Sequence, residues 1–274
     1  MPELPEVETI ARVLRQGNPD QPAIVGHRIL QADLLWERTL AEPDPAEFQR
    51  RLPGQVIEQT SRRGKFLVLR LSRGWLLFHL RMSGDLLVRP AGTPLATHDR
   101  LVFELDGNLQ LAFNDARKFG RVWLVDEVDP VLGQLGPEPL DEGFRAAELF
   151  ERLHHTHRQL KPLLLDQSFL AGLGNIYVDE ALNLARLHPL TPANKLSAKQ
   201  ADRLLASIRA VLKDGISRNG ASIDWVYRGG DFQNYFRVYQ RTGEPCPKCG
   251  TPIARMVVGQ RGTHYCPHCQ PLPS

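Results

Sequence analysis

Four cysteines near the end of the chain have the side-chain type and spacing of a metal site. They occur as CPKC at 246–249 and CPHC at 266–269, with 16 residues between the pairs. Two such pairs can give four thiolates to one tetrahedral Zn²⁺, and four sulfurs leave no open position for a reactive water. A redox pair is the alternative. The spacing therefore predicts one structural zinc ion, bound by Cys246, Cys249, Cys266 and Cys269.

The segment between the two cysteine pairs, ARMVVGQRGTHYC, predicts a hairpin with Arg261 at its tip. A guanidinium on a hairpin stiffened by metal suits a phosphate backbone. The charge distribution agrees, because residues 201–274 contain ten Lys or Arg and five Asp or Glu, whereas the whole chain carries a net charge of only +3. Charge alone, however, is also typical of an ordinary solvated surface.

The N-terminal stretch MPELPEVETI contains a second group of candidate residues. Pro5 suits the first position of a helix, Glu6 suits the positive end of the helix dipole, and the apolar repeat up to Gly17 predicts an amphipathic helix. Pro2 and Glu3 precede this helix, and helix formation does not explain them. A Met followed by Pro is normally trimmed, which gives Pro2 a free secondary amine. Because an α-amine has a pKa of about 8, part of it is unprotonated near neutrality and can act as a nucleophile.

The elements that must position these residues fall into three regions. From about 24 to 128, β-rich runs such as FLVLRL, WLLFHL and LVFEL alternate with Gly and Pro, which predicts an antiparallel sandwich. Turn-forming residues at 132–145 predict a linker. Helical patterns follow, among them NIYVDEALNLARL, for which Asn175 is the expected N-cap. The cysteine hairpin completes the order of elements.

The composition excludes a membrane-embedded protein. No apolar run reaches the length of a membrane span, and the first residues lack the basic-then-apolar pattern of a signal peptide. Charged residues make up 24% of the chain and hydrophobic residues 42%, which is ordinary for a globular protein. The sequence therefore predicts a cytosolic protein of one or two cores with no membrane partner.

Three motifs in this order, PELPEVET at 2–9, GLGNIYVDEAL at 172–182 and the four-cysteine hairpin, resemble the bacterial formamidopyrimidine-DNA glycosylase (Fpg/MutM) family. Their order and spacing together are highly specific. Further matching segments extend the resemblance over nearly the whole chain: RRGKFL at 62–67, HLRMSGDL at 79–86, THDR at 97–100, NDARKFGR at 114–121 and LGPEPL at 135–140.

The resemblance implies an α+β fold of two domains. An N-terminal catalytic β-sandwich with flanking helices would occupy 1–131, and a linker 132–145. A helix–two-turn–helix DNA-binding domain would occupy 146–237, and the zinc finger 238–274. The resemblance further implies a monomer that acts on damaged double-stranded DNA in the bacterial cytoplasm, associated with the nucleoid through DNA binding. It implies no nucleotide cofactor.

The activity implied by the resemblance is that of a bifunctional DNA glycosylase and abasic-site lyase of base-excision repair. Such enzymes remove 8-oxoguanine and formamidopyrimidines through a Schiff base on the N-terminal proline, here Pro2, and then cleave the strand by β- and δ-elimination. Glu3 matches the acid/base that protonates the sugar ring oxygen. Lys65 matches a lysine that contacts DNA and assists ring opening, and a phosphate-binding lysine on a strand is the alternative.

Further residues match the DNA contacts of the family. Met82, Arg117 and Phe119 match the wedge that fills the gap left by the flipped base, with Arg117 also pairing with the orphaned cytosine. Burial in the sandwich core is the alternative for Met82 and Phe119. Candidate contacts to the DNA backbone are His79, His98, Lys161, Asn175 and Arg261, and for His79, His98 and Lys161 a purely structural role is equally consistent with the sequence.

The lesion pocket implied by the resemblance contains Glu6, Tyr227 and Arg228. Glu6 can equally be a partner of the helix dipole. The segment 220–241 is a few residues shorter than the loop that folds over the flipped base in many relatives, so Tyr227 and Arg228 would form only a short cap.

Two alternative functions remain. An endonuclease VIII-type glycosylase for oxidised pyrimidines is disfavoured by the Met-Arg-Phe set, and a non-catalytic zinc-dependent DNA-binding protein is disfavoured by Pro2 and Glu3.

Overall fold

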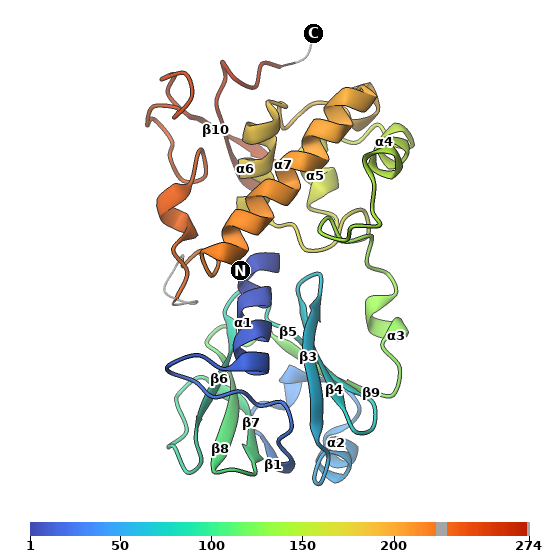
Figure 1. The fold of residues 1–274 in the computed structure, drawn as a ribbon, viewed down its shortest axis with the longest axis vertical. Helices are drawn as coiled ribbons and strands as arrows, with labels where there is room; N and C mark the ends of the chain where they lie inside the picture. Colours follow the sequence, from blue (N-terminus) through green and yellow to red (C-terminus); the bar gives the residue numbers. More distant parts are fainter. Residues whose placement is uncertain (223–228, 273–274) are drawn as a thin grey trace. The chain divides into compact units, whose positions relative to one another are not determined.

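The computed structural model describes residues 1–222 and 229–272 (Figure 1). The chain divides into two compact units. The N-terminal unit consists of Met1–Gln134 with Ser222 and Gly229, and the C-terminal unit consists of Leu135–Ala221 and the chain from Gly230 onward. Among the described residues, no helix has both the length and the apolar character that crossing a bilayer requires.

The N-terminal unit contains two sheets and confirms the predicted sandwich. The first sheet is antiparallel throughout, in the order β1 (Ile29–Leu34), β7 (Asp99–Leu105), β8 (Leu109–Asp115) and β6 (Gly84–Pro90). The second has the order β2 (Leu40–Glu42), β9 (Arg121–Val125), β5 (Trp75–His79), β4 (Phe66–Leu71) and β3 (Ile57–Arg63). Only the short pair of β2 and β9 is parallel.

Alternation of apolar residues along the strands gives the sandwich its core. Phe78 lies at its centre, with its ring 6.2 Å from that of Phe103 and 5.7 Å from that of Phe113. The inward residues of both sheets belong to one buried cluster, which also includes Val7 and Leu14 of the first helix. Burial of these apolar side chains is the main favourable term in the stability of this unit.

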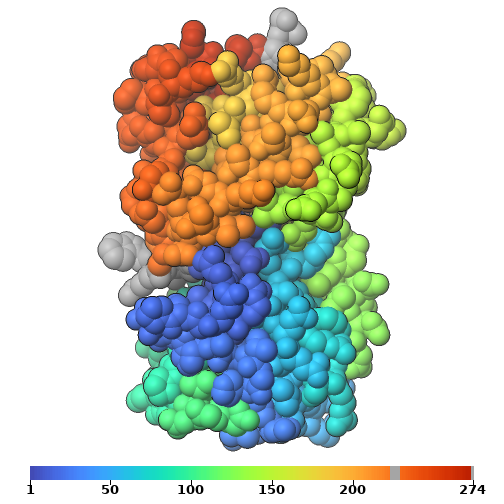
Figure 2. All heavy atoms as spheres, viewed as in Figure 1, coloured from blue at the N-terminus to red at the C-terminus, as the bar shows by residue number. Residues whose placement is uncertain are grey.

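Helix α1 (Leu4–Gln16) covers part of the sandwich beside β3. The Thr60 hydroxyl donates to the Ala11 carbonyl at 3.1 Å, and Arg62 Nε donates to Glu8 Oε2 at 2.8 Å. In Figure 2 the N-terminal residues (blue) adjoin β3 and β4 (cyan) on the face shown. The remaining helical segments of this unit are η1 (Glu37–Thr39), α2 (Pro45–Arg51) and α3 (Asp129–Leu132).

The C-terminal unit is helical and carries the hairpin. Its elements are α4 (Ala146–His154), α5 (Leu160–Leu164), α6 (Asn175–Ala185), η2 (Ala193–Lys195), α7 (Ala198–Ser217), η3 (Phe232–Tyr235), β10 (Ala254–Val258) and β11 (Arg261–Tyr265). Helices α6 and α7 approach closely at Gly215, where a Cβ atom would lie 2.5 Å from the Tyr177 ring. The predicted hairpin is confirmed, and its two turn residues, Gly259 and Gln260, have the positive φ angles of a type I′ turn.

Two predicted helix starts are wrong by one residue. The first helix begins at Leu4, so Glu3 is its N-cap and Pro5 occupies the second helical position. The helix of the GLGN motif has Gly174 as its N-cap, and Asn175 is its first helical residue. Gly174 has extended backbone angles and its carbonyl accepts the Val178 N–H, which together define the capping position.

Candidate functional site

Pro2 and Glu3 lie buried at the N-terminus of α1, whereas Met1 is 46% exposed. The Glu3 N–H donates to Glu6 Oε2 at 2.8 Å, which is one hydrogen bond of a capping box. Helix formation therefore does explain part of the role of Glu3, contrary to the sequence-based interpretation. Glu6 is itself only 2% exposed, so this carboxylate fixes the backbone beside Pro2.

Lys65 occupies the turn between β3 and β4, next to Gly64 with φ 57°. Contacts along α1 run from Ala11 opposite Thr60 to Glu8 opposite Arg62. Because the two elements run in opposite directions, the amino end of α1 is directed toward the Lys65 turn. Lys65 is only 6% exposed, so it is not the freely solvated lysine that a basic surface cluster would contain.

His79 pairs with Phe66 across β4 and β5 and lies in the environment of Lys65. Burial first, and then the positive charges of Arg81 and Lys65, lower the pKa of His79 to about 3. Its Nδ1 accepts the Arg81 N–H at 3.1 Å. The imidazole is therefore neutral near pH 7 and acts here as an acceptor that orders the start of the following loop.

Three of the motif segments meet at one end of the four-stranded sheet. Gly84 of β6 pairs with Asp115 of β8, and Asp99 of β7 pairs with Asn114. The loops at 80–83, 96–98 and 116–120 therefore all lie at this end of the sheet, although they are far apart in sequence. The sheet order β7-β8-β6 explains this convergence, because β8 ends where its two antiparallel neighbours begin.

The three wedge candidates lie in these loops and are accessible. Met82 is 37% exposed and Phe119 51%, so the core alternative for both is wrong. The guanidinium carbon of Arg117 lies 5.2 Å from the ring centroid of Phe119. The arginine and the ring are thus already stacked as a pair, a contact that favours a defined orientation of both side chains.

His98 is exposed in the loop that precedes β7, and its Nδ1 lies 3.3 Å from Arg100 Nη2. Arg100 is buried, and its Nε donates to the Asp115 carbonyl at 2.8 Å. The fold therefore places the exposed imidazole of His98 at the same end of the sheet as the three wedge candidates.

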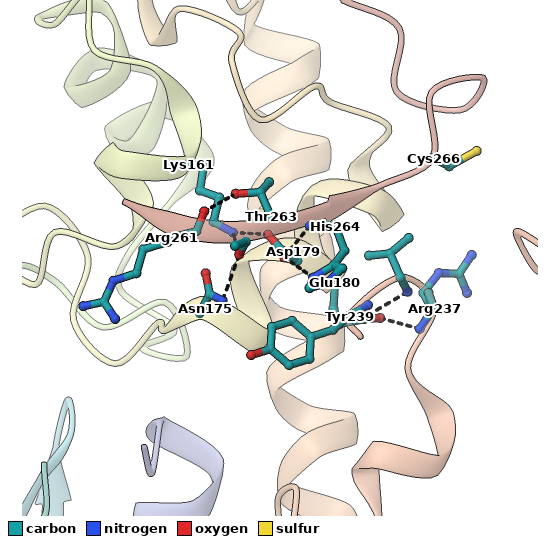
Figure 3. Close-up of polar contacts among 12 residues, drawn as sticks. Lys161, Asn175, Asp179, Glu180, Arg237, Tyr239, Arg261, Thr263, His264 and Cys266 are labelled. Atoms are coloured by element: carbon teal, nitrogen blue, oxygen red, sulfur yellow. Dashed lines mark hydrogen bonds and ion pairs between the residues drawn. The ribbon is translucent and has the colours of Figure 1, made fainter. Parts of the chain in front are cut away.

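Asn175 and Arg261 are brought together in the C-terminal unit (Figure 3). Asn175 Nδ2 donates to the carbonyl of Gly262 at 3.1 Å, and Arg261 is the exposed neighbour of that glycine. The Asn175 Oδ1 atom is buried and has no hydrogen-bond partner among the described residues. A phosphate group accepts hydrogen bonds, so the groups here that suit it are the second N–H of Asn175 Nδ2 and the adjacent exposed guanidinium.

Lys161, in contrast, cannot reach a phosphate from its position. Its side chain has no exposed surface, and its Nζ lies 2.6 Å from Asp179 Oδ1 and donates to the Gly262 carbonyl at 3.0 Å. The expectation of a direct DNA contact is therefore corrected, because this ammonium is used to bind the hairpin to α5 and α6. Lys161 shares the Gly262 carbonyl with Asn175. Figure 3 shows both side chains beside the hairpin strand that carries Arg261 and Thr263.

The sequence-based interpretation missed the acidic residues of α6 as structural determinants. Asp179 Oδ2 accepts the His264 N–H at 2.9 Å, and Glu180 accepts the backbone N–H groups of residues 237–239 at 2.8–2.9 Å. Glu180 is 1% exposed, so it is not a surface glutamate. Burial raises its pKa, while the three N–H donors act in the opposite direction.

One signal in the sequence could have indicated this role. Asp179, Glu180 and Asn183 interrupt an otherwise apolar helix, and Asn183 Nδ2 donates to Gln270 Oε1 at 2.9 Å. Polar groups on a buried helix face require partners, because an unpaired buried polar group is costly. Here the partners come from both ends of the cysteine-containing segment.

The four cysteines are arranged for one metal ion. Their Sγ atoms all lie within 4.8 Å of one another, and Cys249 Sγ is 3.5 Å from the sulfurs of both Cys266 and Cys269. Sulfurs around a tetrahedral Zn²⁺, each about 2.3 Å from the metal, lie roughly 3.8 Å apart. The arrangement therefore fits a four-thiolate zinc ion with no catalytic position.

Protonation of these thiols depends on their surroundings. Hydrogen bonds from the hydroxyl and N–H of Thr251 lower the pKa of Cys249 to about 6. Burial and the neighbouring sulfurs raise the pKa of Cys269 to about 12. A bound dication would supply the charge that four adjacent thiolates need.

Two of the expected pocket residues, Tyr227 and Arg228, lie outside the described residues. Glu6, the third, is placed at the capping box of α1.

Three family models match successive parts of the chain. The model of the formamidopyrimidine-DNA glycosylase N-terminal domain matches residues 1–122, and the model of the H2TH domain of the same glycosylases matches 135–226. The model of a zinc finger found in FPG and IleRS matches 243–272. Together they account for both units and for the cysteine hairpin.

Curated proteins and solved structures agree with these matches. A formamidopyrimidine-DNA glycosylase of Symbiobacterium thermophilum is 45% identical over 282 residues, which cover 100% of this chain and 90% of the relative. MutM in complex with DNA containing carbocyclic 8-oxo-G has a TM-score of 0.90 and 38% identity, with 99% and 100% of the two chains covered. Wild-type Lactococcus lactis Fpg (MutM) with DNA containing an oxidized pyrimidine has a TM-score of 0.91 and 36% identity, with the same coverage.

Proposed function

Because the chain belongs to the formamidopyrimidine-DNA glycosylase family, we propose that it removes 8-oxoguanine and formamidopyrimidines from double-stranded DNA and then cleaves the strand at the resulting abasic site. The observation that carries this proposal is the buried pair of Pro2 and Glu3 at the capped N-terminus of α1. A catalytically silent DNA-binding protein would have no use for a free amine on Pro2.

Pro2 is the proposed nucleophile. Once Met1 is removed, the secondary amine attacks C1′ of the damaged nucleotide, and the bond from C1′ to the base breaks. The sugar ring opens as its oxygen takes up a proton, which leaves an iminium between Pro2 and C1′. Loss of a proton from C2′ then expels the 3′ phosphate, and a second elimination expels the 5′ phosphate.

Glu3 is the proposed acid and base of these steps. Its carboxyl would give the proton to the ring oxygen, and its carboxylate would accept protons later. The hydrogen bond from the Glu3 N–H to Glu6 supports this assignment, because it fixes the residue that must reach the sugar. Glu6 is therefore proposed to position Glu3 as well as to border the lesion pocket.

Lys65 is proposed to act at the edge of the same site. Its turn lies on the side toward which the amino end of α1 is directed. Lys65 is only 6% exposed, which suits a lysine that contacts a DNA group inserted into the site and not one on an open surface. An ammonium there would stabilise a nearby phosphate and assist ring opening.

DNA binding is proposed to use two surfaces, one in each unit. Met82, Arg117 and Phe119 would fill the gap in the duplex, with His98 contacting the backbone nearby. Asn175 and Arg261 would hold the phosphates around the lesion, because Asn175 Nδ2 binds the carbonyl of Gly262, the chain neighbour of Arg261. The zinc ion is structural and keeps the hairpin in place, and the DNA-bound protein would act as a monomer associated with the chromosome.

Trapping with borohydride tests the nucleophile. Reduction during reaction with a duplex containing 8-oxoguanine should give a covalent adduct, and peptide mapping should place it on the Pro2 nitrogen. A matched variant with one extra residue before Pro2 should give no adduct and no strand cleavage. An adduct on Lys65 with a free N-terminus would reject the assignment.

A second arm tests the acid and base. Glu3→Gln should bind lesion DNA nearly as well as the parent while base excision falls by about 10²-fold or more. Retained excision would show that another group moves the proton. Including a duplex with an oxidised pyrimidine measures the lesion range, since faster release of that base than of 8-oxoguanine would favour the endonuclease VIII-type activity.

A further inference from the structure

We propose that Asp115 is a positioning residue for strand intercalation. Its buried carboxylate holds the loops at 80–83 and 116–120, called the wedge loops below, in a fixed relative position, so that Met82, Arg117 and Phe119 enter the duplex as one unit. The inference rests on the proposed function, because it concerns how those three side chains act together. Asp115 itself would touch neither DNA nor the reacting atoms.

The carboxylate of Asp115 joins both loops directly. It has no exposed surface, and Oδ1 accepts the Ser83 hydroxyl as well as the Arg117 N–H, the latter at 3.2 Å. Its Oδ2 accepts the Gly120 N–H at 2.7 Å. Ser83 follows Met82, and the 117–120 segment contains Phe119, so one carboxylate binds the side chain next to Met82 and the backbone of Arg117 and Gly120.

A second connection runs from loop to loop. The Ser83 hydroxyl oxygen accepts the Arg117 N–H at 3.0 Å while its proton is donated to Asp115. The two loops are therefore linked by a closed network of three groups. Such a network is stronger than its separate bonds, because hydrogen bonds inside a protein polarise one another.

The backbone of the loops depends on this network. Lys118 has φ 59°, a left-handed conformation that is costly for a residue with a side chain. Gly120 permits no side chain, because a Cβ atom would lie 2.4 Å from the Phe113 ring. The carboxylate bonds on both sides of these positions offset that cost, so their loss should allow the loop to relax.

The loop at 96–98 is also bound to Asp115, but through the backbone of Asp115 and not through its carboxylate. The Asp115 N–H donates to the His98 carbonyl at 2.8 Å, and its carbonyl accepts Arg100 Nε. These bonds do not require the carboxylate. Substitution of the side chain should therefore affect the wedge loops and leave the His98 loop in place.

The test compares Asp115→Asn with the parent in single-turnover excision. Asn keeps the size of the side chain, but its NH₂ group cannot accept from Gly120. We expect excision of 8-oxoguanine opposite cytosine to fall by about tenfold or more, because misplacement of contact groups is costly. Preference for cytosine over adenine should fall with it. Strand cleavage at a preformed abasic site, where no base must be displaced, should change by less than about threefold.

Two further variants separate positioning from folding. Asp99→Asn alters another buried carboxylate of the same sheet, bonded to Arg89, Asn114 and Ala96 but to neither wedge loop, and should keep the preference for cytosine. Ser83→Ala removes the connection between the loops and keeps Asp115, so it should shift both readouts in the same direction by a smaller factor. It decides the matter if Asp115→Asn does not fold.

The outcomes distinguish this inference from the proposed function. A folded Asp115→Asn with unchanged preference for cytosine overturns it, and so does an equal loss at abasic sites. If Arg117→Ala keeps the full preference, the wedge assignment itself fails. If Arg117→Ala loses the preference for cytosine while Asp115→Asn and Ser83→Ala keep it, only the positioning role of Asp115 is rejected.

Discussion

Arg117 is exposed beside the Phe119 ring, at the position from which it would meet the base opposite the lesion. Orphaned cytosine offers acceptors at O2 and N3 to a guanidinium, whereas adenine offers a donor where the guanidinium needs an acceptor. We therefore expect cleavage of 8-oxoguanine opposite cytosine to be roughly ten- to a hundredfold faster than opposite adenine. Arg117→Ala should largely erase this difference in single-turnover assays.

Lys118→Ala provides the matched control for that prediction. It removes the same charge from the same loop, but the Lys118 ammonium lies 4.0 Å from the Trp36 ring centroid and so already has a partner within the protein. Its preference for cytosine should be retained. Equal rates opposite both bases in the unmodified enzyme would contradict the role of Arg117.

His79 gives a prediction for the pH dependence of stability. Its pKa is lowered from 6.5 to about 3, so between these values the unfolded chain binds a proton that the folded protein does not. The free energy of unfolding should therefore fall as the pH is lowered through this range, with a slope of up to about 1.4 kcal/mol per pH unit from this residue. Urea denaturation at pH 7 and pH 5 should show a smaller loss for His79→Gln than for the parent.

Comparison of variants removes the contributions of all other groups. His98→Gln alters an exposed histidine of the same unit and should follow the parent at both pH values. An unchanged pH slope in His79→Gln would show that the buried imidazole does not control this part of the stability curve.

Helix α6 connects the hairpin to the rest of the C-terminal unit through paired charges. Lys161→Met should leave Asp179 as an unpaired buried carboxylate, which costs about 3–5 kcal/mol. The effect is measured by chemical denaturation, together with a loss of DNA affinity as β11 shifts. Asp179→Asn in the same chain should restore much of the stability, because a neutral amide still accepts the His264 N–H.

Lys199→Met is the control for the Lys161→Met prediction. It removes one lysine from the exposed side of α7 and should change stability by less than about 0.5 kcal/mol. Equal stability of Lys161→Met and the parent would mean that the buried ion pair contributes nothing to holding the hairpin.

The metal connects the stability of the finger with DNA binding by the whole molecule. One zinc ion per chain should be measured, and chelation should weaken binding to all duplexes, because Arg261 loses its support. Borohydride trapping on abasic DNA at saturating protein should persist, since the metal supplies no reacting group. Full DNA affinity in a metal-free sample would contradict the structural role.

Arg261→Ala separates the guanidinium from the metal. This variant should retain zinc and lose affinity evenly across sequences, with the salt dependence reduced by about one phosphate contact. A salt dependence equal to that of the parent would place the phosphate contact elsewhere.

Short-range patterns in the sequence determined the zinc ligands, the hairpin, the first helix and the strands of the sandwich. The two cysteine pairs and the turn at Gly259 and Gln260 are specified within a few residues, so local geometry suffices to predict them. Strand periodicity likewise predicts the sandwich, because alternate side chains must share one core. The order of its strands does not follow from that periodicity.

The tertiary structure decided which of the polar candidates are buried and with which partners. Lys161 and Asn175 have equally plausible patterns for binding DNA, yet Lys161 is buried because Asp179 and the Gly262 carbonyl, 101 residues away, surround its ammonium. Asp115 had no distinguishing signal, since its partner Ser83 meets it only through the pairing of β6 with β8. Burial depends on which distant segments pack together, and that information is absent from the pattern of any one segment.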